Sequence, residues 1–294
     1  MGLESIASLD LASPAGVRAA LAAAGLRLRR SRGQHFLVSR RALEAMLRAA
    51  GLTPADVVLE IGAGIGTLTV ELARTGAAVI AVEVDARFIP VLRASCAAYP
   101  RVRLVHADAM TLEPAALRPR PTAVVANLPY AIASPLLIRL LEAHTARRYV
   151  VMVQDEVARR LVAAPGTPAY GLLTVAVGAH ASAAVVARVP RAAFFPPPEV
   201  TSAVVRLDVP AVPPVPPELV GPLMAVARAA FGQRRKMLRS ALRQLGPRAA
   251  TGDDAEALCR AAGIDPRERG ERLSLAAFAR LAAALRDREA APHP

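Results

Sequence analysis

Two hydrophobic periods alternate along the first two thirds of the chain. Short runs that are almost wholly apolar predict buried strands, and longer stretches with an apolar residue every three or four positions predict helices. The predicted strands are residues 57–61, 78–82, 102–105, 122–126, 149–153, 184–189 and 201–207. The predicted helices are residues 13–28, 40–50, 68–75, 132–141, 154–161 and 170–180. Strands that alternate with helices predict an α/β fold.

The pattern changes near residue 210. Residues 210–217 are rich in proline, which is typical of a linker, and no strand pattern follows them. Helices are predicted beyond this linker at residues 219–230, 234–245, 254–262 and 274–286. We therefore predict an α/β domain at residues 1–210, with a basic helical extension at its N-terminus, and an all-helical domain at residues 211–294. The extension ends in a cluster of arginines: Arg27, Arg29, Arg30 and Arg32.

Composition narrows the possible partners. The chain has 294 residues, 54% of them hydrophobic, and its 37 Lys+Arg against 24 Asp+Glu give a formal charge of +13. This charge favours a polyanionic partner, with nucleic acid as the leading candidate and a merely soluble basic surface as the alternative. Neither cysteines nor histidines show metal-ligand spacing, so we expect no metal. With no secretory signal and no uninterrupted apolar span, we expect a cytoplasmic protein without membrane contact.

A glycine-rich turn follows the first strand of the series directly. Gly62, Gly64 and Gly66 have the spacing GxGxG, and Thr67 stands where the dinucleotide fingerprint has its third glycine. Glycines let a ligand approach the backbone closely because no Cβ is in the way. The turn therefore predicts a nucleotide-type cofactor that lacks a pyrophosphate.

Polar residues follow the next three strands where each one ends. Glu83 has the spacing at which a carboxylate meets ribose hydroxyls, and Asp108 is a candidate acceptor for the amine of the cofactor's adenine. Residues 127–130, Asn-Leu-Pro-Tyr, combine an amide acceptor, a rigid proline and an aromatic ring. This platform suits a flat ring that carries an amino group, which we interpret as adenine. Each feature alone is also typical of a turn, but together they predict one site at the sheet edge.

Two segments combine aromatic and basic or proline residues and are candidate sites for nucleic-acid contact. Phe194 and Phe195 precede a run of prolines, which predicts either a surface for stacking a base or a hydrophobic loop packed on the domain. Phe231 precedes the densest basic cluster, and we predict RNA contact by Arg234, Arg235, Lys236 and Arg239. Not all of this cluster can share one helix face, so part of it must point away from a single ligand.

Several segments, taken in order, form a recognisable set. They include GQHFL at residues 33–37, EIGAGIGTLT at 60–69, NLPYAIASPLL at 127–137, AFFPPPEVTSAVVRL at 193–207 and AFGQRRKMLRSAL at 230–242. The set resembles the ribosomal RNA adenine N6-dimethyltransferases, specifically the bacterial small-subunit type whose loss gives kasugamycin resistance. The resemblance covers nearly the whole chain. It implies a Rossmann-like class I methyltransferase sheet, mostly parallel with an antiparallel last strand, and a smaller all-α C-terminal domain.

The resemblance also implies a cofactor and a role for particular residues. S-adenosylmethionine would be bound by His35, Leu37, Gly62, Gly64, Glu83, Asp108 and Asn127. The target adenine would lie between Tyr130 and Phe194, with its N6 hydrogens accepted by the side chain of Asn127 and the backbone carbonyl of Leu128.

The implied activity is dimethylation of two adjacent adenines in small-subunit ribosomal RNA. The expected partner is this RNA within an immature 30S particle, and we expect the chain to act as a monomer without metal. Two alternatives stay open: a large-subunit methyltransferase of the erythromycin-resistance type, and a non-catalytic RNA-binding factor of ribosome assembly.

Overall fold

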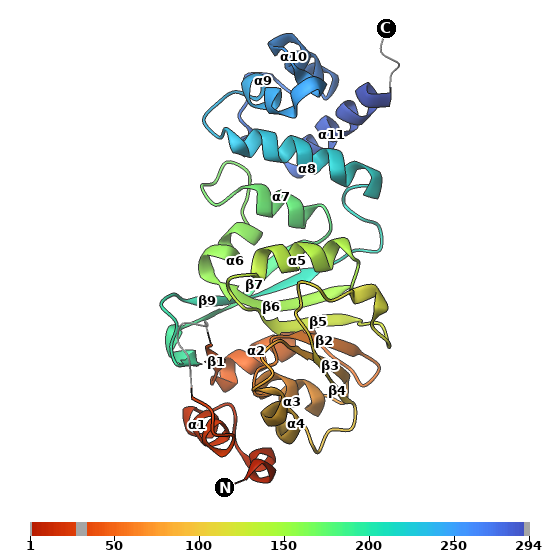
Figure 1. The fold of residues 1–294 in the computed structure, drawn as a ribbon. Coiled ribbons are helices and arrows are strands. Elements are labelled where there is room, and N and C mark those ends of the chain that lie inside the picture. The colour runs from red at the N-terminus through yellow and green to blue at the C-terminus, as the bar shows by residue number, and fades with distance from the viewer. Residues whose placement is uncertain (1, 28–33, 291–294) are drawn as a thin grey trace. The chain divides into compact units, whose positions relative to one another are not determined.

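The computed structural model describes residues 2–27 and 34–290 (Figure 1). Contacts within the chain divide it into two compact units, Met1–Ala158 with Ala183–Asp208, and Arg159–Ser182 with Val209–Pro294. The second unit thus includes the segment Arg159–Ser182, which the sequence analysis placed in the α/β domain. The domain boundary at residue 210 stays a prediction. In the predicted N-terminal arginine cluster, Arg29, Arg30 and Arg32 lie outside the described residues.

The first unit is built on a seven-stranded sheet with the order β4-β3-β2-β5-β6-β9-β7. The strands are β2 (Val57–Ile61), β3 (Ala78–Glu83), β4 (Val102–His106), β5 (Ala123–Asn127), β6 (Arg148–Gln154), β7 (Ser182–Val189) and β9 (Ser202–Asp208). Strands β4, β3, β2, β5 and β6 pair in parallel, and β9 pairs antiparallel with β6. The predicted fold, a mostly parallel sheet with an antiparallel last strand, is confirmed.

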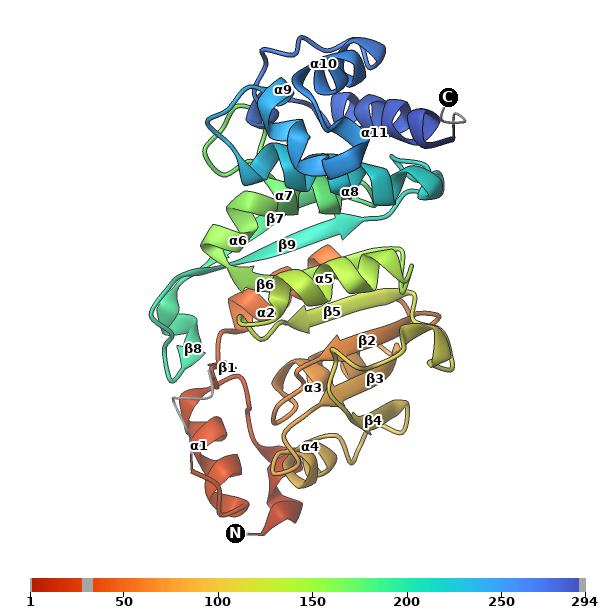
Figure 2. The ribbon, with the colours of Figure 1, turned by 45° about the horizontal axis from the view of Figure 1, so that its top comes forward.

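Helices cover both faces of this sheet (Figure 2). Alternate strand residues point to opposite faces. Val58 and Val150 pack in one core with Met46 of α2, whereas Tyr149 points the other way and donates its hydroxyl to the Leu140 carbonyl of α5, at 2.9 Å. The helices of this part of the chain are α1 (Pro14–Ala23), α2 (Arg40–Ala50), α3 (Thr67–Arg74), α4 (Ile89–Ser95), α5 (Ala133–Glu142) and α6 (Asp155–Leu161).

Two helices differ from the sequence-based expectation. Helix α1 ends at Ala23 rather than near residue 28, because Gly25 adopts a left-handed φ of +66° that terminates the helix. Helix α4 was not predicted. It is only one to two turns long, and its N-cap residue, Phe88, makes no side-chain capping bond.

The second unit is helical, as expected. Its helices are α7 (Leu172–Gly178), α8 (Pro217–Gly232), α9 (Leu238–Ala241), α10 (Gly252–Ala261) and α11 (Leu275–Ala290), with a 3₁₀ helix at Leu242–Ala249. The prediction of a helix over residues 234–245 was wrong at its start, since residues 233–237 form a turn and α9 begins at Leu238. In the described part of the chain, no helix has both the length and the apolar character that crossing a membrane requires.

Candidate active site

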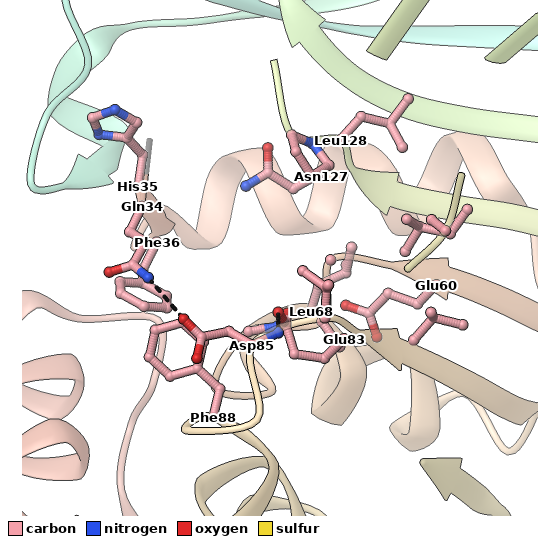
Figure 3. Close-up of a pocket in the computed structure, with 18 of the residues that line it drawn as sticks. Gln34, His35, Phe36, Glu60, Leu68, Glu83, Asp85, Phe88, Asn127 and Leu128 are labelled. Atoms are coloured by element: carbon pink, nitrogen blue, oxygen red, sulfur yellow. Dashed lines mark hydrogen bonds between the residues drawn. The ribbon is translucent and has the colours of Figure 1, made fainter. Parts of the chain in front are cut away.

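A cavity of about 770 Å³ lies at the carboxyl ends of β2, β3, β4 and β5 (Figure 3). Residues from the glycine turn after β2, from the loops after β3, β4 and β5, and from the segment around β1 (Phe36–Leu37) line it. Strands β2 and β5 are neighbours from which the strand order runs in opposite directions, which is where open α/β sheets bind ligands. The volume is in the range of small-molecule and cofactor sites.

The glycine turn forms one wall of the cavity, and it requires its glycines. Gly62 and Gly64 have φ values of +75° and +57°, in the left-handed region. A Cβ on Gly62 would lie 3.4 Å from Cδ of Pro129, and one on Gly64 would lie 3.3 Å from Cε1 of Phe36. The turn is therefore packed closely against its neighbours and offers bare backbone to a ligand.

The two predicted carboxylates lie at the neighbouring strand ends. Glu83 is buried, and its oxygens accept hydrogen bonds from the amides of Gly64, at 2.7 Å, and Asp85, at 2.8 Å. Asp108 is exposed, and one of its oxygens accepts from the amide of Met110 at 2.8 Å. These bonds orient both carboxylates and leave each with lone pairs for a ligand.

Residues 127–130 form the neighbouring wall, where Pro129 packs against the glycine turn. Asn127 ends β5, and its side-chain amide has no hydrogen-bond partner within residues 2–27 and 34–290. The amide of Leu128 donates to the carbonyl of Met152 at 3.1 Å, and the Leu128 side chain is buried. These contacts fix the backbone on which Asn127 stands.

The ring of Tyr130 is held at two points. Its hydroxyl and the hydroxyl of Ser202 are hydrogen-bonded at 2.6 Å, and its face stacks with the ring of His35 at a centroid distance of 6.4 Å. Burial raises the pKa of the Tyr130 hydroxyl, so it stays protonated at neutral pH. His35 is itself held by a 2.8 Å hydrogen bond between its Nδ1 and the carbonyl of Pro196.

Strand β1 completes the lining, but Phe194 does not reach it. Leu37 lines the cavity and pairs with Phe194 in the two-residue strand β8 (Phe194–Phe195). The Phe194 side chain is 3% exposed and belongs to the same buried core as Leu37. Phe195 is half-buried, and the guanidinium of Arg18 lies 4.5 Å from its ring centroid. The position of a target base between Tyr130 and Phe194 stays a prediction, and it requires the ring of Phe194 to become accessible.

Several lining residues were not predicted from the sequence: Gln34, Phe36, Glu60, Asp85 and Phe88. Glu60 is 2% exposed, and its Oε2 has no hydrogen-bond partner among the described residues. Burial raises its pKa to about 8; the Thr69 hydroxyl opposes this shift and the charge of Glu83 adds to it. An acidic residue inside an apolar strand pattern was the available signal, because a buried carboxyl is costly without a compensating role.

The predicted RNA-binding residues of the second unit separate into two pairs. Arg234 donates to the carbonyls of Pro168, at 3.2 Å, and Tyr170, at 2.9 Å, and Arg239 pairs with Glu256 at 3.1 Å. Both arginines thus have internal partners.

Arg235 and Lys236, by contrast, are exposed in the turn and have no side-chain partner in the part of the chain that the structure describes. The neighbouring Phe231 packs between Tyr170 and Phe278, with ring centroids 5.7 Å and 5.6 Å away. Two of the predicted cations are therefore free for a ligand, and the aromatic ring beside them has a structural contact.

Comparison with known proteins identifies the family. A family model described as ribosomal RNA adenine dimethylase matches residues 25–287. The chain belongs to this family. The description of the family names adenine in ribosomal RNA as the group that is methylated. The cavity agrees with this description, because the amide of Asn127 and the ring of Tyr130 both line it.

Relatives of the family match almost the entire chain. The chain is 46% identical to ribosomal RNA small subunit methyltransferase A of Phenylobacterium zucineum, over 99% of this chain and 97% of the relative. It is 42% identical to the protein of the same name from Geobacillus thermodenitrificans, over 94% and 97%.

Two solved structures share the fold. A dimethyladenosine transferase from Plasmodium falciparum has a TM-score of 0.70 at 25% identity and covers 85% of this chain and 97% of its own. The 23S rRNA methyltransferase ErmE has a TM-score of 0.65 at 29% identity, with 85% and 99% covered.

Proposed function

We propose that the protein transfers methyl groups from S-adenosylmethionine to N6 of two adjacent adenines in small-subunit ribosomal RNA, within an immature 30S particle. The observation that carries the proposal is the single cavity that gathers the glycine turn, Glu83, Asp108 and Asn127. The relatives at 42–46% identity that are named after the small subunit favour this substrate over the large subunit.

The residues of the cavity fit this cofactor. Gly62 and Gly64 expose backbone where a side chain is excluded, and Glu83 is oriented to accept from the two hydroxyls of a ribose. Asp108 offers a carboxylate to an adenine amine at the next strand end, and His35, Leu37 and Asn127 complete the set. The cofactor supplies a methyl group on a sulfonium, which is a strong electrophile.

The acceptor side has a different task. The N6 amine of adenine is a poor nucleophile because its lone pair is delocalised into the ring. If the side-chain oxygen of Asn127 and the carbonyl of Leu128 each accept one N6 hydrogen, the nitrogen is drawn toward tetrahedral geometry and its lone pair is freed. Tyr130 holds the base flat and Pro129 keeps the platform rigid. Positioning and electrostatics of this kind require neither a strong general base nor a metal.

RNA binding is assigned to the turn at residues 233–237. Arg235 and Lys236 present free charge there, and the loop that carries Arg267 and Arg269, both exposed, lies beside it. This loop is joined to the start of α9 by two backbone hydrogen bonds, from Leu238 to Glu268 at 2.8 Å and from Arg239 to Pro266 at 3.1 Å. Cations from two chain segments thus form one surface that suits RNA phosphates.

The test is methyl transfer from labelled S-adenosylmethionine to separated immature small and large ribosomal subunits, followed by nucleoside analysis. We expect N6,N6-dimethyladenosine in small-subunit RNA only. Labelling of the large subunit instead would support the erythromycin-resistance type, and binding to the small subunit without any label would support an assembly factor. Action as a cytoplasmic monomer without metal remains part of the proposal.

A further inference from the structure

We propose that Gln34 and Asp85 are positioning residues that fasten the β1 segment across the cofactor cavity and thereby slow cofactor release. This inference rests on the proposed function. Gln34 Nε2 donates to Asp85 Oδ2 at 3.3 Å, and this bond joins two lining segments that are far apart in the sequence (Figure 3).

One edge of the β1 segment is attached independently of this bond. Phe36 and Leu37 pair with β8, and the amide of Val38 donates to the carbonyl of Ala193 at 2.7 Å. The 2.8 Å contact of His35 with the carbonyl of Pro196 lies on the same side. These bonds hold the β1 segment to β8 and the residues that flank it, but they do not connect the segment to the loop after β3.

Within the described residues, the other edge meets that loop through side-chain contacts of Gln34 and Phe36. One is the bond between Gln34 and Asp85, and the other is the edge-to-face contact of Phe36 and Phe88, with ring centroids 5.6 Å apart at 82°. Phe36 also covers the glycine turn, since a Cβ on Gly64 would lie 3.3 Å from its ring. The segment therefore spans the cavity from β8 to the loop after β3.

Asp85 is a well-fixed acceptor for this bond. Its amide donates to Glu83 at 2.8 Å, and its Oδ1 accepts from the backbone amide and Nε of Arg87 at 3.1 Å and 2.8 Å. The Asp85 side chain is only 14% exposed. Because Glu83 also holds the glycine turn through Gly64, Gln34 is fastened to the same network that orients the proposed ribose acceptor.

The hydrogen bond between Gln34 and Asp85 is weak enough to allow repeated exchange of the cofactor. A hydrogen bond of 3.3 Å is slightly longer than the usual range of about 2.7–3.2 Å, so the bond resists opening only modestly. Dimethylation of two adenines consumes several cofactor molecules for each RNA, and spent cofactor must leave between transfers. A weak side-chain fastening slows release without preventing this exchange.

The experiment measures release of S-adenosylmethionine and S-adenosylhomocysteine from the full chain by stopped-flow displacement, and affinity by calorimetry. Gln34→Ala and Asp85→Ala should each raise the release rate about 5- to 10-fold, and the double variant should be no worse than the poorer single variant. Gln34→Glu, which places a second carboxylate beside Asp85, should release at least as fast as Gln34→Ala. Gln244→Ala, the same kind of change in the second unit, should leave release unaltered.

The melting temperature of ligand-free Gln34→Ala should match that of the original chain within experimental error. Unchanged release, independent addition of the two single effects, or a parallel loss of melting temperature would each overturn the proposal. Failure of the original chain to bind either cofactor form would instead contradict the proposed function.

Discussion

The cofactor cavity of the first unit and the basic turn of the second differ in how their polar side chains are held. In the cavity, Glu83 accepts from two backbone amides, and Tyr130 is held by Ser202 and His35. In the turn, Arg235 and Lys236 have no side-chain partner among the described residues, and the arginine next to them, Arg234, is used to hold the fold.

This difference follows from what each region has to recognise. Methyl transfer needs reacting atoms in a fixed geometry, so groups that are already oriented lose little entropy on binding. Phosphate contacts are mainly electrostatic and release counterions, so flexible cations are sufficient. Changes in the cavity should therefore affect rates and pH dependence, whereas changes in the turn should affect the salt dependence of RNA binding.

The largest effect is expected for Asn127→Ala. If its amide oxygen activates the N6 amine, the single-turnover methyl-transfer rate at saturating cofactor should fall about 10²- to 10³-fold. RNA affinity should not change, because the reacting base is the only part of the RNA that Asn127 would contact. Rapid-quench assays with labelled cofactor and filter binding with the RNA measure the two quantities.

A matched control is Gln154→Ala, which removes an amide from the end of the adjacent strand β6, outside the cavity lining. It should leave the rate within about twofold of the original. If Asn127→Ala retained the full rate, Asn127 would be a turn residue with no part in activating the N6 amine.

Features of the fold and of the site that depend on local sequence could be predicted from the sequence alone. The strands and the glycine turn were predictable because their signals are local: β2 is an apolar run interrupted only by Glu60, and Gly62 and Gly64 need left-handed φ values. The meeting of Glu83, Asp108 and Asn127 at one edge follows from parallel strand order.

Other features depend on tertiary contacts that no local pattern encodes. Phe194 is buried in the core because β8 pairs with β1, across more than 150 residues of chain. Arg234 donates to the carbonyls of Pro168 and Tyr170, which are over 60 residues away in the sequence, and no local pattern indicates this contact. The bond between Gln34 and Asp85 has no sequence signal either, since the two residues are 51 positions apart.

Glu60→Gln should have an intermediate effect, on stability. The pKa of Glu60 is about 8 in the folded chain, above the usual glutamate value of about 4.5, so the folded state binds more protons than the unfolded state between these values. Stability of the original chain should thus fall as pH rises through this window. At pH 8 the neutral glutamine should be more stable by about 2–3 kcal/mol, less than the full shift implies because the surroundings relax around the charge.

Denaturant unfolding of the cofactor-free proteins between pH 5 and 9 measures this difference. The two chains should have nearly equal stability at pH 5 and diverge toward pH 8. Profiles that stay parallel over the whole range would mean that Glu60 is ionised in the folded chain, and that its unpartnered oxygen is accommodated in another way.

The smallest effects should separate the two kinds of cation around the turn. The double variant Arg235→Ala/Lys236→Ala should reduce the slope of log Kd for RNA against log salt concentration by about 1.5, since each lost phosphate contact contributes about 0.7–0.9. Its free energy of unfolding should not change, because neither side chain has a partner in the described chain.

Arg234→Ala should instead lower the free energy of unfolding by about 1 kcal/mol through the lost bonds to Pro168 and Tyr170, with little change in the salt slope. The opposite assignment, with Arg234 governing the salt dependence and the double variant destabilised, would show that the turn rearranges when RNA binds, and the contrast between a rigid cavity and a free basic surface would not hold.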